Sequence, residues 1–113
     1  MTCLFCKICQ GEIPATIVHQ TDTVMAFNDI NPQAPTHVLI IPKKHIETIN
    51  DISVDDTLLI GDMVMAAKTL ADSYNLKENG YRLVFNTNKH GGQQVYHIHL
   101  HLLGGRQMTW PPG

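Results

Sequence analysis

The sequence predicts an α+β domain in which an antiparallel sheet carries a helix on one face. Three observations support this fold class. Apolar runs of strand length stand on both sides of one long amphipathic segment, short turn-rich stretches connect consecutive runs, and histidines alternate with apolar residues in the last fifth of the chain. Consecutive strands joined by short turns pair antiparallel, and one helix covers one face of such a sheet. The predicted order is a short helix, three strands, a long helix and two strands.

Size, charge and cysteine content narrow the class of protein. The 113 residues suit a single domain spanning 1–113. A net charge of −2 argues against a nucleic-acid partner, because proteins that bind nucleic acid neutralise phosphates with an excess of Lys and Arg. We expect no membrane segment, since no apolar stretch reaches about 18 residues, and no signal peptide. Three cysteines, an odd number, do not form a disulfide framework, so we expect a reducing cytoplasm.

The first part of the chain predicts a short helix, a hairpin and a buried strand. Apolar positions at 4, 5 and 8 favour a helix over residues 3–9. Residues 17–20 and 24–27 are strand-like and are separated by a three-residue turn, which indicates a hairpin. A loop with two prolines, residues 28–35, leads into the apolar run 37–42, the predicted central strand.

The middle of the chain predicts the long helix. Ser53 and Asp56 match a capping box, and apolar residues recur at helical spacing from Leu59 to Tyr74. The helix should therefore run from 54 to about 75, with its apolar stripe in the core. A strand over 81–86 and a loop over 87–94 follow.

Residues 96–103 place three histidines at alternate positions, which is the period of a strand with one buried face. On a strand, His97, His99 and His101 would project from one face about 6.5–7 Å apart. Residues 96, 98, 100 and 102 would face the core. Three groups that titrate near neutral pH in one row indicate a functional site rather than a solvated face.

Two kinds of chemistry suit this row of imidazoles. Two histidines on one strand face plus a third ligand could bind a catalytic metal, or a neutral imidazole could act as a covalent nucleophile. Gly91 and Gly92, just before the row, would let backbone N–H groups approach a bound oxyanion closely. This loop favours phosphate chemistry over a metal centre with three histidines.

The stretch 97–103 resembles the signature of the histidine-triad (HIT) family, and 27–30, 32–37, 41–45, 91–96 and 104–113 resemble further motifs of its Hint branch of purine-nucleotide-binding hydrolases. The resemblance implies a five-stranded antiparallel sheet with one long and one short helix, and a homodimer that joins two sheets into ten strands. It also implies hydrolysis of purine nucleoside 5′-phosphoramidates, or of aminoacyl-AMP type adducts, through a nucleotidyl-histidine intermediate. No cofactor would be required for catalysis.

The resemblance also assigns roles to residues. His99 would attack phosphorus, and His101 would contact the phosphate and help the leaving amine to take its proton. His97 and His37 would complete the set of imidazoles. The implied nucleotide-binding residues are Asp29 for the ribose, Phe5, Ile8, Ile13 and Ile30 around the purine, and Asn86, Gly92, Gln93 and Gln94 at the phosphate.

Two positions depart from the family pattern. Gln94 stands where much of the eukaryotic Hint branch has serine, which bears on leaving-group preference. Asn28 stands where that branch often has histidine, which bears on base stacking.

The N-terminal cysteines allow several interpretations. Cys3 and Cys6 form a C-x-x-C pair, which fits half a zinc site, a redox pair or ordinary core cysteines. Together with His45 and His97 they resemble the Cys-Cys-His-His zinc set of some HIT proteins, which implies a structural zinc ion. Reduced, metal-free cysteines are the alternative.

Three functional hypotheses therefore stand. The first is a phosphoramidate hydrolase with His99 as nucleophile. The second is a nucleotide-binding regulatory or scaffold module, and the third is a hydrolase with a catalytic zinc at the triad.

Overall fold

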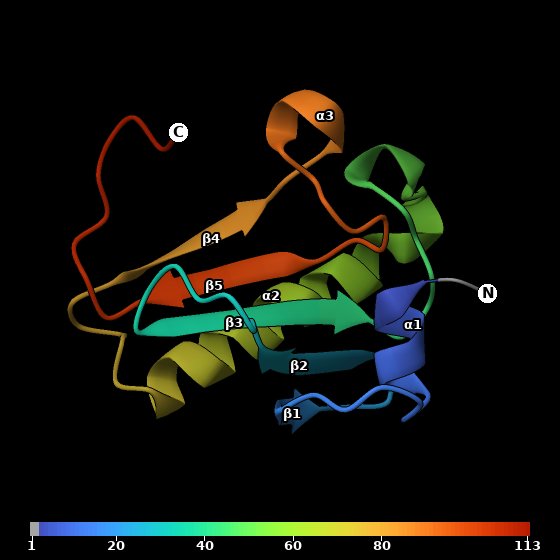
Figure 1. Ribbon diagram of the computed structural model, residues 1–113, viewed down its shortest axis with the longest axis horizontal. Helices are drawn as coiled ribbons and strands as arrows, with labels where there is room; N and C mark the ends of the chain where they lie inside the picture. The colour runs from blue at the N-terminus through green and yellow to red at the C-terminus, as the bar shows by residue number, and fades with distance from the viewer. Residues whose placement is uncertain (1–2) are drawn as a thin grey trace.

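The computed structural model describes residues 3–113 and contains one five-stranded sheet in the order β1-β2-β3-β5-β4. All neighbouring strands pair antiparallel, with β3 in the middle and β1 and β4 at the edges. The predicted fold class is confirmed (Figure 1). The strands are β1 (Ile17–Gln20), β2 (Val24–Asn28), β3 (Thr36–Pro42), β4 (Tyr81–Phe85) and β5 (Leu100–Gly104).

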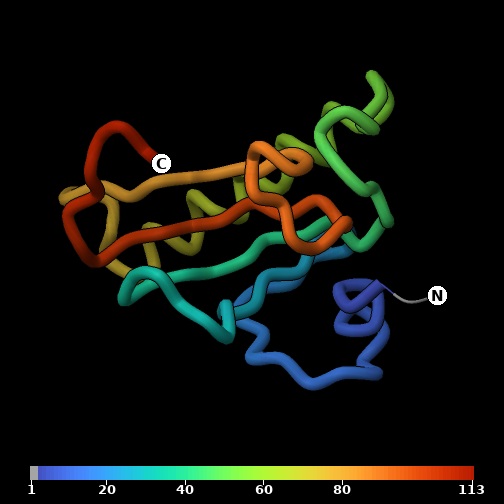
Figure 2. The backbone as a smooth tube through the Cα atoms, turned by 45° about the horizontal axis from the view of Figure 1, so that its top comes forward, coloured from blue at the N-terminus to red at the C-terminus, as the bar shows by residue number. Residues whose placement is uncertain are grey.

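Helices cover both faces of the sheet. The long helix α2 (Thr57–Ser73) crosses behind the sheet in Figure 1, and the short helix α1 (Leu4–Cys9) lies on the opposite face, as Figure 2 shows. No helix within residues 3–113 is both long and apolar enough to cross a membrane. The expectation of a helix on one face was therefore incomplete, because α1 covers part of the face that was expected to carry only histidines.

This two-sided cover explains the apolar runs of β2 and β3. Successive side chains of a strand point to opposite faces. Val24 and Ala26 accordingly pack with α2, whereas Met25 and Phe27 pack with α1. A strand that is buried on both faces needs apolar residues at successive positions, and β3 has them from Val38 to Pro42, after Thr36 and His37.

The core under α2 is formed by the predicted helical stripe. Met63, Ala66, Ala67 and Leu70 are buried against side chains of β2, β3 and β5. Full burial of a large aliphatic side chain of this kind stabilises the fold by roughly 1.5–3 kcal/mol. The stripe is therefore a packing surface, as predicted.

The ends of the long helix differ from the prediction. The capping box is present, with the Asp56 carboxylate accepting from the Ser53 N–H at 2.9 Å, but it opens a 3-10 turn over Val54–Asp56, and α2 begins at Thr57. A second 3-10 turn spans Ile49–Asp51. Asn75 has a positive φ of 60°, which ends the helical conformation soon after Ser73.

The predicted loop over 87–94 contains a one-turn helix, α3 (Asn88–Gly91). The Asn88 N–H donates to Gln93 Oε1 at 3.0 Å, so a side chain from beyond the turn holds its first residue. Gly92 closes the turn with a φ of 79°, a conformation that favours glycine.

The histidine strand is shorter than predicted. β5 begins at Leu100, so only His101 of the three histidines lies in a strand. The Ile98 N–H donates to the Ile46 carbonyl at 2.7 Å, outside any strand pairing, and this contact leads the preceding segment away from the sheet. The three imidazoles still lie on the side of the sheet that α1 covers, since the Phe5 ring packs edge-on against the rings of His97 and His99, and the His101 ring lies 5.0 Å from that of His99. Tyr96, expected in the core, is 41% exposed.

Candidate active site

A cavity of about 270 Å³ lies where the β2–β3 loop meets the segments on both sides of α3 and the start of β5. Most of its lining was predicted from the sequence. Asn31 and Gln33 were not, although both lie in the proline-bounded loop that precedes His37. The lining residues are Asp29, Asn31, Gln33, His37, Asn86, Gly92, Gln94, His99 and His101.

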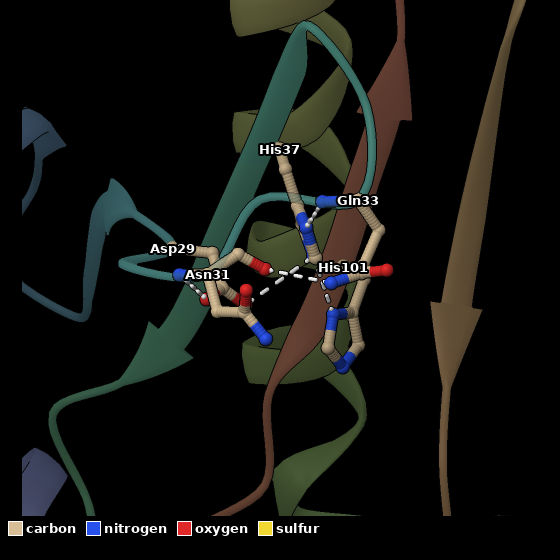
Figure 3. A network of polar contacts seen from close by, with 5 residues as sticks. All are labelled: Asp29, Asn31, Gln33, His37 and His101. Carbon is tan, nitrogen blue, oxygen red and sulfur yellow. Dashed lines mark hydrogen bonds and ion pairs between the residues drawn. The ribbon is translucent and has the colours of Figure 1, made fainter.

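His37 is the centre of a polar network at this cavity (Figure 3). The Gln33 backbone N–H donates to His37 Nδ1 at 3.0 Å. An Nδ1 that accepts leaves the ring proton on Nε2. That Nε2 lies 2.9 Å from His101 Nδ1 and 3.4 Å from Asp29 Oδ2, so the hydrogen-bond pattern assigns it as the donor to His101.

His101 therefore carries its own proton on Nε2. This nitrogen is buried and has no hydrogen-bond partner among the residues that the structure describes. Burial, with His99 and His37 nearby, lowers the pKa of His101 to about 4, against an opposing effect of Asp29. The ring is neutral near neutral pH, and its Nε2–H is available to an acceptor bound in the cavity.

His99 has the opposite tautomer. Its Nδ1 lies 2.8 Å from the His97 carbonyl, so Nδ1–H donates and Nε2 keeps its lone pair. Burial lowers the pKa of His99, and the bond to the His97 carbonyl and the charge of Asp29 oppose this effect only in part. Burial likewise lowers the pKa of His37. A neutral imidazole with a bare Nε2 has the form of a nucleophile.

Two aromatic rings hold the His99 ring in place. The Phe5 ring meets it edge-on with centroids 5.2 Å apart, and the His101 ring lies 5.0 Å away. The bare Nε2 of His99 and the Nε2–H of His101 are therefore neighbouring groups at the same cavity.

Asp29 serves both as a turn former and as a cavity residue. Its Oδ1 accepts from the Asn31 N–H at 2.8 Å, while Oδ2 approaches His37. The side chain is 19% exposed, so the carboxylate remains within reach of a ligand. Aspartate often stabilises a turn in this way, because its short side chain can accept a hydrogen bond from the backbone N–H two residues later in the chain.

The glycine loop differs from the expected row of free donors. The N–H groups of Gly92 and Gln93 donate to the carbonyls of Lys89 and Asn88, which closes the turn of α3. The buried Gln93 side chain does not line the cavity, since its Nε2 donates to the carbonyls of Glu47 at 2.7 Å and Val95 at 3.1 Å. Gln93 therefore ties the loop to the segment between β3 and the 3-10 turn Ile49–Asp51.

The four residues that were expected to surround the purine do not all lie close together. Phe5 and Ile8 are buried in the cluster under α1, and Ile13 packs against that cluster. Ile30 is 99% exposed, next to Asp29. None of these four lines the cavity, and Phe5 meets it only through the ring of His99.

A second constellation brings together Cys3, Cys6, His45 and His97, with one ligand atom from each within 4.8 Å of the others. His97 Nδ1 lies 3.4 Å from Cys3 Sγ, 3.5 Å from Cys6 Sγ and 3.3 Å from His45 Nδ1. A tetrahedral zinc site with ordinary bond lengths has N···N edges of about 3.3 Å and N···S edges of about 3.5 Å.

The hydrogen bonds of His97 also suit a metal. Its Nε2–H donates to the Pro42 carbonyl at 2.7 Å, which leaves the Nδ1 lone pair directed at the cluster. Burial raises the pKa of Cys6 to about 11 in the metal-free protein, so metal binding would displace a thiol proton. Within this constellation the donor types, spacing and tautomer fit zinc.

Comparisons with known proteins identify the family of this chain. The family model of the HIT domain matches residues 10–108. The purine nucleoside phosphoramidase of Escherichia coli (strain K12) is 54% identical over 105 residues, which cover 93% of this chain and 88% of that protein. The crystal structure of a HIT family hydrolase from Legionella pneumophila Philadelphia 1 superposes with a TM-score of 0.98 at 67% identity, covering 99% of this chain and 100% of that one. A histidine triad protein from Clostridium difficile gives a TM-score of 0.93 at 39% identity, covering 96% and 95%. This chain belongs to the HIT family.

Proposed function

We propose that this protein hydrolyses purine nucleoside 5′-phosphoramidates, including AMP–amine and aminoacyl-AMP type adducts, to the nucleoside monophosphate. The observation that carries the proposal is the pair of opposite tautomers at the cavity. The bare Nε2 of His99 stands beside the Nε2–H of His101, which supplies a nucleophile and a proton donor. The name of the E. coli relative supports the purine and the phosphoramidate.

In the first step, His99 Nε2 attacks the α-phosphorus, the P–Nε2 bond forms and the P–N bond to the amine breaks. The leaving nitrogen takes a proton from His101 Nε2, because an amine leaves readily only when it is protonated. A phosphate anion bound in the cavity favours the protonated form of His101, so substrate binding prepares the acid. The contact between His37 Nε2 and His101 Nδ1 keeps the His101 ring oriented.

In the second step, water attacks phosphorus and the P–Nε2 bond to His99 breaks. The proton that water loses goes to His101, which acts here as the base. The products are the nucleoside monophosphate and His99 with its bare Nε2. Two displacements replace one difficult displacement, which is the general advantage of a covalent intermediate.

The direct test is release of AMP from an AMP–amine conjugate by the wild-type protein and by His99→Ala. We expect the variant to lose at least about 10³-fold in turnover, because no other group replaces the nucleophile. His19→Ala, a histidine of β1 outside the cavity, should keep wild-type turnover. Undiminished turnover by His99→Ala would refute the mechanism. Tight AMP binding with negligible wild-type turnover on several conjugates would favour a nucleotide-binding module instead.

We also propose that Cys3, Cys6, His45 and His97 bind a structural zinc ion. When bound, the ion would link α1 to the end of β3 and to the triad segment. The purified protein should contain about one zinc per chain, and Cys6→Ser should lose it and unfold at a lower temperature. Cys9→Ser changes a thiol on the same helix outside the constellation and should retain the metal. Equal zinc contents of the two variants would contradict this site.

A cytoplasmic homodimer completes the proposal. The edge strand β4 carries Tyr81 and Leu83, each more than a third exposed, and an unpaired strand edge is a template for pairing with another strand. Two copies joined there would form the ten-stranded sheet. Sedimentation of Leu83→Glu tests this, since the charge should give a monomer where the wild type is a dimer. The cytoplasmic location rests on three cysteines that are all free thiols.

A further inference from the structure

A second cavity, of about 390 Å³, lies next to the histidine cavity. Its lining residues are Cys3, Leu4, His45, Glu47, Gln94, Val95 and Tyr96. Gln94 is the residue that both linings share. A ligand group that extends from the histidines past Gln94 therefore enters this second cavity.

Hydrogen bonds to two backbone carbonyls hold the second cavity in shape. The buried Gln93 amide donates to the Glu47 carbonyl at 2.7 Å, and the Ile98 N–H donates to the Ile46 carbonyl at 2.7 Å. These bonds fasten residues 46–47 to residues 93–98. Glu47 and Gln94 consequently stand on a common rigid base, which reduces the cost of ordering the site on binding.

The walls of this cavity differ in chemistry. Leu4 and Tyr96 are 43% and 41% exposed and present apolar and aromatic surface. Glu47 supplies a carboxylate, and the ion pairs found in residues 3–113 join His37 to Asp29 and Lys44 to Asp56, so Glu47 is in neither. An apolar or aromatic group that carries a positive charge would complement these walls.

The proposed reaction places one substrate group at this position. With the ribose at Asp29 and phosphorus between His99 and His101, the base extends on the ribose side and the leaving amine extends away from it. Gln94 borders the phosphate position from the loop before β5, whereas Asp29 comes from the loop after β2. The substituent of the amine is thus the part of the substrate that can pass Gln94.

We propose that the second cavity is a subsite for the leaving group, in which Glu47 selects amines that carry a second positive charge on an apolar or aromatic frame. The inference rests on the proposed phosphoramidate hydrolysis. It assigns Glu47 and Gln94 to leaving-group specificity, and it gives a physical role to the position where this chain has Gln94.

The test uses three AMP conjugates of 2-phenylethylamine whose ring carries hydrogen, an aminomethyl group or a carboxylate at the position farthest from the amine. The reacting nitrogen is nearly the same in all three, so differences in kcat/KM report the distal group. Glu47 is an exposed residue, and a single ion pair at an exposed site changes kcat/KM by about fivefold at most. We therefore expect the wild type to favour the cationic over the neutral conjugate by up to about fivefold and to disfavour the anionic one.

The variant Glu47→Gln should bring the ratio of cationic to neutral kcat/KM close to one. Glu78→Gln removes an exposed carboxylate that lines neither cavity and should keep the wild-type ratio. High salt should also reduce the wild-type preference, because charges near the surface are screened.

Each outcome has a definite consequence. A ratio that Glu47→Gln leaves unchanged refutes the subsite while hydrolysis stands. No release of AMP from any conjugate by the wild type refutes the proposed function and the subsite with it. If Glu47→Gln instead alters discrimination among charged groups placed on the purine, the cavity holds the base, and the proposal is wrong.

Discussion

Lowering the pH from about 7.5 to about 5 should destabilise the fold, and His101 should account for a measurable part of the loss. Burial holds the pKa of His101 at about 4, below its ordinary value of 6.5. At a pH between these two pKa values, His101 binds a proton in the unfolded chain but not in the folded chain. The contribution of His101 to the free energy of unfolding is therefore fully present above pH 6.5 and is lost as the pH falls toward 4.

The size of the effect follows from the shift. Each pKa unit is worth about 1.4 kcal/mol, and pH 5 lies about 1.5 units below the unfolded pKa, which gives about 2 kcal/mol as an upper limit. Because the ring is partly exposed, solvent screening reduces this to about 1 kcal/mol. Burial also lowers the pKa values of His37, His97 and His99, which adds loss in the same direction.

Urea unfolding at the two pH values, with a chelator in all samples, measures this quantity. His101→Asn removes the titrating group, so its loss of stability on acidification should be smaller than that of the wild type by about 1 kcal/mol. His19→Asn, which contacts none of the imidazoles at the cavity, is the matched control. An equal acid loss in wild type and His101→Asn, or a gain of stability in acid, would refute the reasoning.

Other predictions follow from single contacts. Asp29→Ala should weaken nucleosides with both ribose hydroxyls much more than 2′,3′-dideoxy analogues, and equal losses by calorimetry would remove Asp29 from the ribose site. Gln93→Leu should destabilise by roughly 1–3 kcal/mol in urea unfolding, because the Glu47 carbonyl loses its buried donor; no change would contradict the bracing role. Gly104→Ala places a Cβ 2.6 Å from Leu76 Cδ1 and should cost roughly 1–3 kcal/mol. In Leu76→Ala the same substitution should cost less, and strictly additive effects would contradict the clash.

Local periodicity predicted the strands and the helix whose positions depend only on burying their apolar side chains. The runs 17–20, 24–27 and 37–42 became β1, β2 and β3 within one residue at each end, because alternating or continuous apolar residues leave one way to bury them. The long helix was predicted from its stripe, and only its ends, which depend on turn geometry, moved.

Contacts between residues far apart in the sequence determine the features that local periodicity did not predict. The alternation of the triad predicted one continuous strand, yet His97 is held by Pro42 and the cysteines of α1, and Ile98 by Ile46. Nothing local in the sequence distinguishes a histidine that faces a cavity from one that faces a cysteine. The role of Gln93 as a brace was hidden for the same reason, since its partner Glu47 is 46 residues away.

The constellation of Cys3 and His97 joins positions 94 residues apart. Closing a loop of that length costs about 4 kcal/mol of chain entropy beyond a constant, and the constellation is complete only once the segment that carries His97 is present. During synthesis, the thiols of Cys3 and Cys6 emerge long before the imidazole that covers them exists. The newly made chain therefore presents its cysteines to oxidants and stray metal ions until its last strands are complete.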